Sequence, residues 1–188
     1  MMRRPVSPSR ARGFTLVELM VVVTLVAVLS AIAVPGFRDL LLNQRLAAST
    51  SEFVAALSLA RTEALKRAQT VTLTPLTPLT PKTKKDWNSG WEVKTAVGGV
   101  ATTLRAFEAL PAGVTVDTGL GNAFNGKLSY DANGFSRNGD AYQMGCVALK
   151  AETGRRSAVV VSASGRPKVC DPDRKGDCGS GQCNAAGN

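Results

Sequence analysis

The sequence predicts an α+β fold in which one long N-terminal helix packs on an antiparallel β-sheet head. Two observations carry this prediction. Residues 14–70 show first a continuous apolar run and then the amphipathic periodicity of a helix. From residue 71 onward, short runs rich in valine, threonine and aromatic residues alternate with Gly, Asn, Asp and Pro, which is typical of strands and turns. Apolar residues make up 44% of the 188-residue chain and charged residues 20%, which favours a packed core over global disorder.

The N-terminal element has the composition of a membrane-spanning helix. Residues 1–13 contain four arginines and no acid, and residues 14–34 are almost entirely apolar. A helix of about 20 apolar residues crosses the hydrocarbon core of a bilayer, and the arginines place residues 1–13 on the cytoplasmic side. A cleaved secretory signal fits less well, because its apolar region is usually about 7–15 residues long and an A-x-A site should follow.

Glu18 is the unusual residue of this apolar run. A carboxylate in lipid costs about 2–3 kcal/mol or more, so it is expected to have a function and a positively charged partner. A free α-amine would be the nearest such partner if the chain were cut before Phe14. A plain single-span anchor leaves Glu18 unexplained.

The segment Gly13-Phe14-Thr15-Leu16-Val17-Glu18 closely resembles the class III signal of type IV pilins and type II secretion pseudopilins. The resemblance implies that a prepilin peptidase cuts after Gly13 and methylates the new N-terminus at Phe14. It also implies that Glu18 pairs with the N-terminus of a neighbouring subunit, and that Pro35 kinks or locally melts the helix. We therefore expect the chain in the bacterial inner membrane, head in the periplasm, before it joins other pilins or pseudopilins in a filament.

The second half of the helix, residues 36–70, is amphipathic. Apolar residues recur at intervals of three, four and seven, which predicts one buried stripe. Glu63 and Arg67 are spaced for an i,i+4 ion pair. The stripe comprises Leu46, Phe53, Leu57, Ala60, Ala64 and Ala68.

The head, residues 71–170, is predicted to contain strands with tight turns between them. Turns are expected at Asn133-Gly134 and Asn138-Gly139, and a hairpin at Gly154-Arg155. The Thr-Pro-Leu repeat of residues 74–81 favours an extended polyproline II spacer, with a PxxP ligand as the alternative, and Lys82, Lys84 and Lys85 follow it. Strands are expected at Val71–Leu73, Gly90–Thr95, Val100–Phe107, Val114–Val116, Lys127–Tyr130, Gln143–Lys150 and Ser157–Ser162.

The head resembles the GspH/FimT group of minor pilins and pseudopilins. The residues that carry this resemblance are Gly90-Trp91-Glu92-Val93, the strand Ala158–Ser162, and Ser164-Gly165-Arg166. The resemblance extends to about Cys170 and implies the pilin fold, with residues 171–188 forming a cysteine- and glycine-rich basic tail.

Four cysteines lie on the exported side of the predicted topology: Cys146, Cys170, Cys178 and Cys183. An oxidising compartment favours two disulfides, and three pairings are open. A zinc site is not expected, because the chain has no C-x-x-C pair and no histidine. At least one disulfide is expected to hold the tail to the sheet.

The C-terminal region holds a charge excess that makes double-stranded DNA a candidate partner. Residues 150–188 contain seven bases and four acids, whereas the leader that would be removed accounts for four of the nine net charges. A solvated basic face is the simpler interpretation, and no nearby aromatic residue in the sequence offers a stacking platform for bases. The candidate contacts are Arg155, Arg156, Arg166, Lys168, Arg174 and Lys175.

The resemblance to FimT-like proteins bears on this region, because those proteins bind DNA through a Gly-Arg-x-Arg motif during natural transformation. Gly165-Arg166-Pro167-Lys168 matches it except that Lys168 stands at the second arginine, which retains the charge but not the guanidinium fork. The alternative is an H-type pseudopilin that acts in type II secretion without binding DNA. No enzymatic activity and no cofactor are expected, because the sequence offers no nucleophile–base pair and no metal-ligand set.

Overall fold

The computed structural model describes residues 13–78, 80, 86–179, 183 and 185. The predicted leader up to residue 12, the lysines Lys82, Lys84 and Lys85, and part of the glycine-rich tail lie outside these residues. Contacts divide the chain into two compact units, Met1–Asp39 and Leu40–Asn188, which are described separately.

The first unit contains the start of helix α1, which runs from Leu16 to Arg67. Thr15 caps this helix, because its hydroxyl accepts a hydrogen bond of 3.2 Å from the backbone amide of Glu18. The apolar side chains from Phe14 to Leu29 are all exposed, and the backbone is helical through Pro35. Among the described residues, no single helix has the length and hydropathy to span a membrane, and Leu16–Ala31 and Gly36–Arg67 do so only as a bent pair.

In the second unit, α1 buries one stripe of side chains, as its periodicity predicts. Five of the six predicted stripe residues are buried, and Leu42 and Ala56 join them. Ala68 is the exception. The helix ends at Arg67, and Ala68 is exposed with a left-handed φ of 51°. Ala68 was therefore wrongly included in the predicted stripe. Arg67 Nε donates to Glu63 at 2.7 Å, which confirms the predicted i,i+4 pair.

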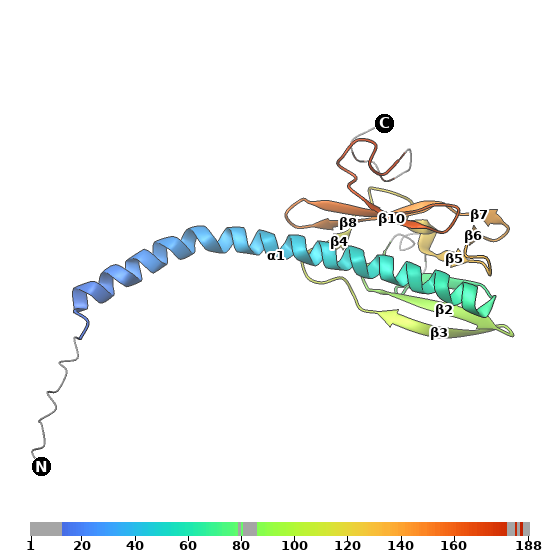
Figure 1. Cartoon of the computed structure of the whole chain (residues 1–188), viewed down its shortest axis with the longest axis horizontal. Coiled ribbons are helices and arrows are strands. Elements are labelled where there is room, and N and C mark those ends of the chain that lie inside the picture. Colours follow the sequence, from blue (N-terminus) through green and yellow to red (C-terminus); the bar gives the residue numbers. More distant parts are fainter. Residues whose placement is uncertain (1–12, 79, 81–85, 180–182, 184, 186–188) are drawn as a thin grey trace, which may run out of the picture. The chain divides into compact units, whose positions relative to one another are not determined.

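The head contains two antiparallel sheets (Figure 1), where the sequence predicted one. The six-stranded sheet has the order β3-β2-β1-β5-β6-β7, and the four-stranded sheet the order β10-β9-β8-β4. Alternation of apolar and polar residues along the sequence indicates where strands lie, but it does not indicate which strands pair. The number of sheets therefore cannot be predicted from it. The strands are β1 (Val71–Pro75), β2 (Trp91–Val97), β3 (Val100–Phe107), β4 (Val114–Val116), β5 (Leu128–Tyr130), β6 (Ser136–Asn138), β7 (Ala141–Tyr142), β8 (Gly145–Ala151), β9 (Arg156–Val161) and β10 (Pro167–Cys170).

All seven predicted strands are present, with shifts of one to two residues at several ends. The predicted turns at Gly134, Gly139 and Gly154 have positive φ values of 76°, 62° and 87°. Three strands were not predicted: β6, β7 and β10. They have three, two and four residues, and none is a run rich in valine, threonine and aromatic residues, the pattern by which the other strands were predicted. A short 3-10 helix, η1 (Ala123–Gly126), was also not predicted.

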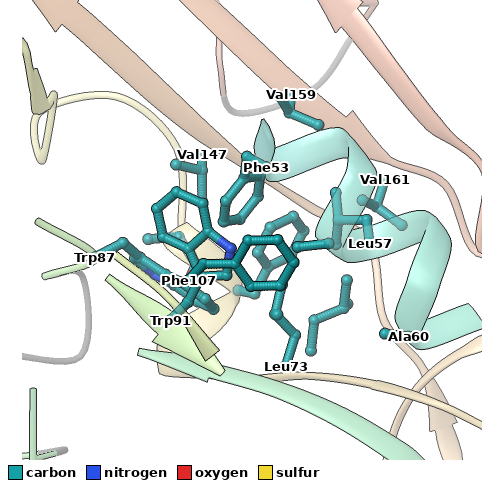
Figure 2. Close-up of a cluster of buried hydrophobic side chains, with 14 of the residues drawn as sticks. Phe53, Leu57, Ala60, Leu73, Trp87, Trp91, Phe107, Val147, Val159 and Val161 are labelled. Carbon is teal, nitrogen blue, oxygen red and sulfur yellow. The ribbon is translucent and has the colours of Figure 1, made fainter. Parts of the chain in front are cut away.

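One hydrophobic core joins α1 to both sheets. Phe53, Leu57 and Ala60 project from the helix, as Figure 2 shows, and their neighbours come from each sheet. The six-stranded sheet contributes Leu73, Trp91 and Phe107, the loop before β2 contributes Trp87, and the four-stranded sheet contributes Val147, Val159 and Val161. Each sheet therefore buries one face against the same helix.

Candidate functional site

The cysteine-rich tail forms a further layer on the outer face of the four-stranded sheet. Cys146 of β8 is bonded to Cys183, and Cys170 of β10 to Cys178, with Cα–Cα distances of 6.1 and 5.2 Å. The four half-cystines pack with Ala148 and Ala158 in a second buried cluster. The pairing left open by the sequence is thus settled, and both disulfides hold the tail to the sheet.

Asp177 organises the tail loop. Its carboxylate accepts a hydrogen bond of 2.7 Å from the amide of Asp171, and Lys168 Nζ lies 3.7 Å from it. Lys168 Nζ also donates to the Asp177 carbonyl at 2.6 Å. The hydrogen bond from the Asp171 amide, followed by the charge of Lys168, lowers the pKa of Asp177 below its usual 3.8. Lys168 is therefore engaged in holding the tail.

Arg156 is also engaged within the protein. It is the first residue of β9, directly after the predicted hairpin at Gly154-Arg155, and it lies between two carboxylates. Arg156 Nε is 3.1 Å from Asp117, and its Nη1 is 2.8 Å from Asp173 of the tail. The count of acids in residues 150–188 includes Asp173, but Asp117 comes from a distant loop that no local sequence pattern connects to β9.

The remaining candidate cations lie at two ends of one strand. Arg155 precedes β9, and Arg166 follows the turn after it, so a strand of six residues, about 20 Å long, separates them. Arg174 and Lys175 belong to the tail loop at the Arg155 end, because Asp173 pairs with Arg156. All four side chains are exposed. The six predicted contacts therefore do not form one continuous patch.

Gly165 of the Gly-Arg-x-Lys motif has a structural role. Its φ is 76°, and a Cβ at this position would collide with the carbonyl oxygen of Gly134 and lie 2.9 Å from the ring of Tyr130. The turn after β9 thus packs closely on the turn before β6, and only a glycine fits. Both cations of the motif are exposed, but Lys168 donates a hydrogen bond to Asp177 of the tail, which leaves Arg166 as the better candidate contact.

The lowered pKa of Asp177 predicts that docking of the tail weakens in acid. A carboxyl whose pKa is lower in the folded state stabilises that state above about pH 3.8, and this contribution is lost as the pH falls through the folded-state pKa. We expect the Asp171 amide, titrated by ¹⁵N NMR of the full chain in detergent micelles, to report a midpoint below 3.8. Asp177→Asn should remove the transition, and a midpoint at or above 3.8 in the parent would contradict the assignment.

Family models match both parts of the chain. The model described as "Type II transport protein GspH" matches residues 49–165, and the "Prokaryotic N-terminal methylation motif" matches residues 8–34. The first match covers more than half of the chain. The chain belongs to the GspH family of minor pilins and pseudopilins. Members of this pilin-like family assemble with other subunits at the cell envelope, and the methylation motif implies prepilin processing.

Two crystal structures of one type IV minor pilin share the fold. The type IV minor pilin FimU of Pseudomonas aeruginosa is 20% identical, with a TM-score of 0.56 over 72% of this chain and 96% of that one. A second crystal form of FimU gives 0.54 over 71% and 99%. The minor pseudopilin EpsH from the type II secretion system of Vibrio cholerae is 10% identical, with a TM-score of 0.49 over 69% and 99%. A comparison with curated proteins found no match.

Proposed function

We propose that this GspH-family chain is cut between Gly13 and Phe14, methylated at Phe14 and inserted into a short filament through the helix of residues 14–35. The supporting observation is the apolar start of α1, which is capped by Thr15, exposed from Phe14 to Leu29, and carries one carboxylate, Glu18, in its first turn. Glu18 has a local role as well, because it stands at the third helical position where an acid favours the positive end of the helix dipole. In the filament, the same Glu18 carboxylate would pair with the methylated N-terminal amine of a neighbouring subunit.

Mass spectrometry of the protein from its native membrane tests the processing step. We expect a mature N-terminus at methylated Phe14, and no cleavage in a Gly13→Leu variant. Glu18→Gln should be processed normally but excluded from filaments, because the variant lacks the charge that attracts the neighbouring amine. Cleavage at another bond, or filaments containing Glu18→Gln at the parental level, would contradict this proposal.

A second candidate function is capture of double-stranded DNA by the basic C-terminal region in a type IV pilus. The exposure of Arg155, Arg166, Arg174 and Lys175 supports it. Arg156 and Lys168 are weaker candidates, because Arg156 is paired with Asp117 and Asp173, and Lys168 with Asp177. The remaining cations would contact phosphates without reading sequence.

Titration of the full chain in detergent micelles with duplex DNA at low and moderate salt tests this function. Arg166→Ala should weaken binding and reduce the salt dependence by about 0.9 in log–log slope for one lost phosphate contact. Arg105→Ala, which removes an exposed cation from β3, is the matched control and should leave binding unchanged. A parent that does not bind duplex at low salt would contradict this function and favour the alternative, an H-type pseudopilin that acts in type II secretion.

A further inference from the structure

The outer face of the six-stranded sheet carries a row of polar side chains that ends at an aromatic residue. Their sequence neighbours Leu73, Val93, Leu128 and Ser136 are buried on the core side, so the row lies on the opposite face. The residues of the row are direct cross-strand partners in the sheet order β3-β2-β1-β5-β6-β7. The row runs Thr103, Lys94, Thr72, Ser129, Arg137 and Tyr142.

Tyr142 is held in place at the end of this row. The guanidinium carbon of Arg137 lies 4.2 Å from the centre of the Tyr142 ring, and Phe135 meets the ring edge-to-face at 5.8 Å. Tyr142 nevertheless remains 58% exposed. An aromatic ring fixed by two neighbours and open to solvent is a preorganised apolar surface for a ligand, because little side-chain entropy is lost when it is covered.

A polar cleft of about 430 Å³ lies over the same row, beside Arg137. Arg137 Nε donates to Asp131 at 2.9 Å, and its Nη1 donates to the Asp140 carbonyl at 3.0 Å. Burial opposes ionisation of Asp131, but the hydrogen bonds from Arg137 and from the amides of Phe135 and Asn133 outweigh it and lower the pKa. The cleft is lined by Thr70, Ser129, Asp131, Arg137, Gly139 and Asp140.

The charges of the cleft select its ligand. Two carboxylates and one guanidinium leave no excess of positive charge, which disfavours phosphates and other polyanions. An apolar peptide is also disfavoured, because it would strip water from these charged groups without replacing their hydrogen bonds. A sugar suits both parts, because its hydroxyls donate to carboxylates and accept from guanidinium and hydroxyl groups, and its C–H face covers an aromatic ring.

We propose that the Ser129–Arg137–Tyr142 face binds a neutral glycan, with one sugar ring on Tyr142 and its neighbour in the cleft of Asp131, Arg137 and Asp140. This inference is independent of the proposed filament and DNA functions, which use the N-terminal helix and the C-terminal region. It assigns a ligand to Tyr142 of β7, the ring that Phe135 contacts, and neither of those functions uses this pair.

Calorimetric titration of the full chain in detergent micelles with β-1,4-linked tetramers of glucose and of N-acetylglucosamine tests the proposal. We expect saturable binding of at least one tetramer. Tyr142→Ala should weaken it by about tenfold, the change that corresponds to ~1.4 kcal/mol of lost stacking. Tyr142→Phe keeps the ring and should bind like the parent. Ser129→Ala, which removes a hydroxyl from the cleft, should also weaken binding.

Val100→Ala is the matched control, because Val100 is 67% exposed at the other edge of the same sheet. It should leave glycan affinity unchanged, and thermal unfolding should confirm that all variants fold. Binding of neither tetramer would overturn the proposal, as would binding that Tyr142→Ala leaves intact. Tyr142-dependent binding of a single-stranded oligonucleotide in place of either tetramer would also overturn it and assign the face to nucleic acid.

Discussion

Phe53→Ala is expected to destabilise the head by about 3–5 kcal/mol, the cost of removing a buried aromatic side chain and leaving a cavity. Phe53 is 1% exposed and makes edge-to-face contacts with two tryptophans, Trp87 at 5.4 Å and Trp91 at 5.1 Å. It projects from α1 into the core that the helix shares with both sheets. Its loss therefore weakens the packing of the helix against each sheet. A domain with about 5–15 kcal/mol of total stability would lose a large part of it.

Thermal unfolding followed by near-UV circular dichroism measures this effect, because Trp87 and Trp91 are buried and report on core packing. We expect Tm to fall by roughly 6–20 °C. Phe37→Ala is the matched control: the same residue type on the same helix, but 64% exposed, with an expected change within about 0.5 kcal/mol. Equal Tm values for the Phe53→Ala and Phe37→Ala variants would contradict the claim that packing of Phe53 in the core stabilises the head.

Removal of the Cys146–Cys183 disulfide is expected to cost more than removal of Cys170–Cys178. The first bond spans 37 residues and the second 8. Loop-closure entropy then gives about 4 kcal/mol for the long loop and about 2.5 kcal/mol for the short one. Replacing each pair with alanines keeps free thiols out of the comparison and retains small apolar side chains in the cluster with Ala148 and Ala158.

Denaturant unfolding of the two double variants, in the full chain in micelles, measures this difference. Limited trypsin digestion adds a local measurement, because Arg174 and Lys175 lie in the loop that Cys170–Cys178 closes. We expect faster cleavage there when the short bond is removed and a larger loss of global stability when the long bond is removed. An equal or reversed order of stability would contradict the loop-closure argument.

Prediction from sequence was strongest where a feature is local. The helical stripe, the hairpin at Gly154 and the i,i+4 pair of Glu63 and Arg67 each depend on residues within a few positions of one another, and each is present. Failures came from pairing at long range. The sequence shows that Arg156 is a cation but not which acids it pairs with. Asp117 and Asp173 become its partners only when the sheet and the tail have packed.

The aromatic residues illustrate the same limit. The sequence offers no aromatic residue near the basic tail, and a stacking surface was therefore not expected there. In the folded head, the turn after β9 packs on the turn before β6, because Gly165 approaches Gly134 and the Ser136 amide donates to the Ala163 carbonyl at 3.1 Å. Phe135 and Arg166 thus belong to neighbouring turns although 30 residues separate them in the chain.

The opening prediction, a long helix packed on an antiparallel head, was determined by the sequence itself, as was the Gly13–Glu18 signal. Periodicity and motif spacing are properties of consecutive residues, so they can be read before the chain folds. The tertiary structure alone decided that the head has two sheets, which cysteines pair and which cations remain exposed. Those outcomes depend on contacts between distant segments, where packing and charge neutralisation select one arrangement among several that the same local patterns allow.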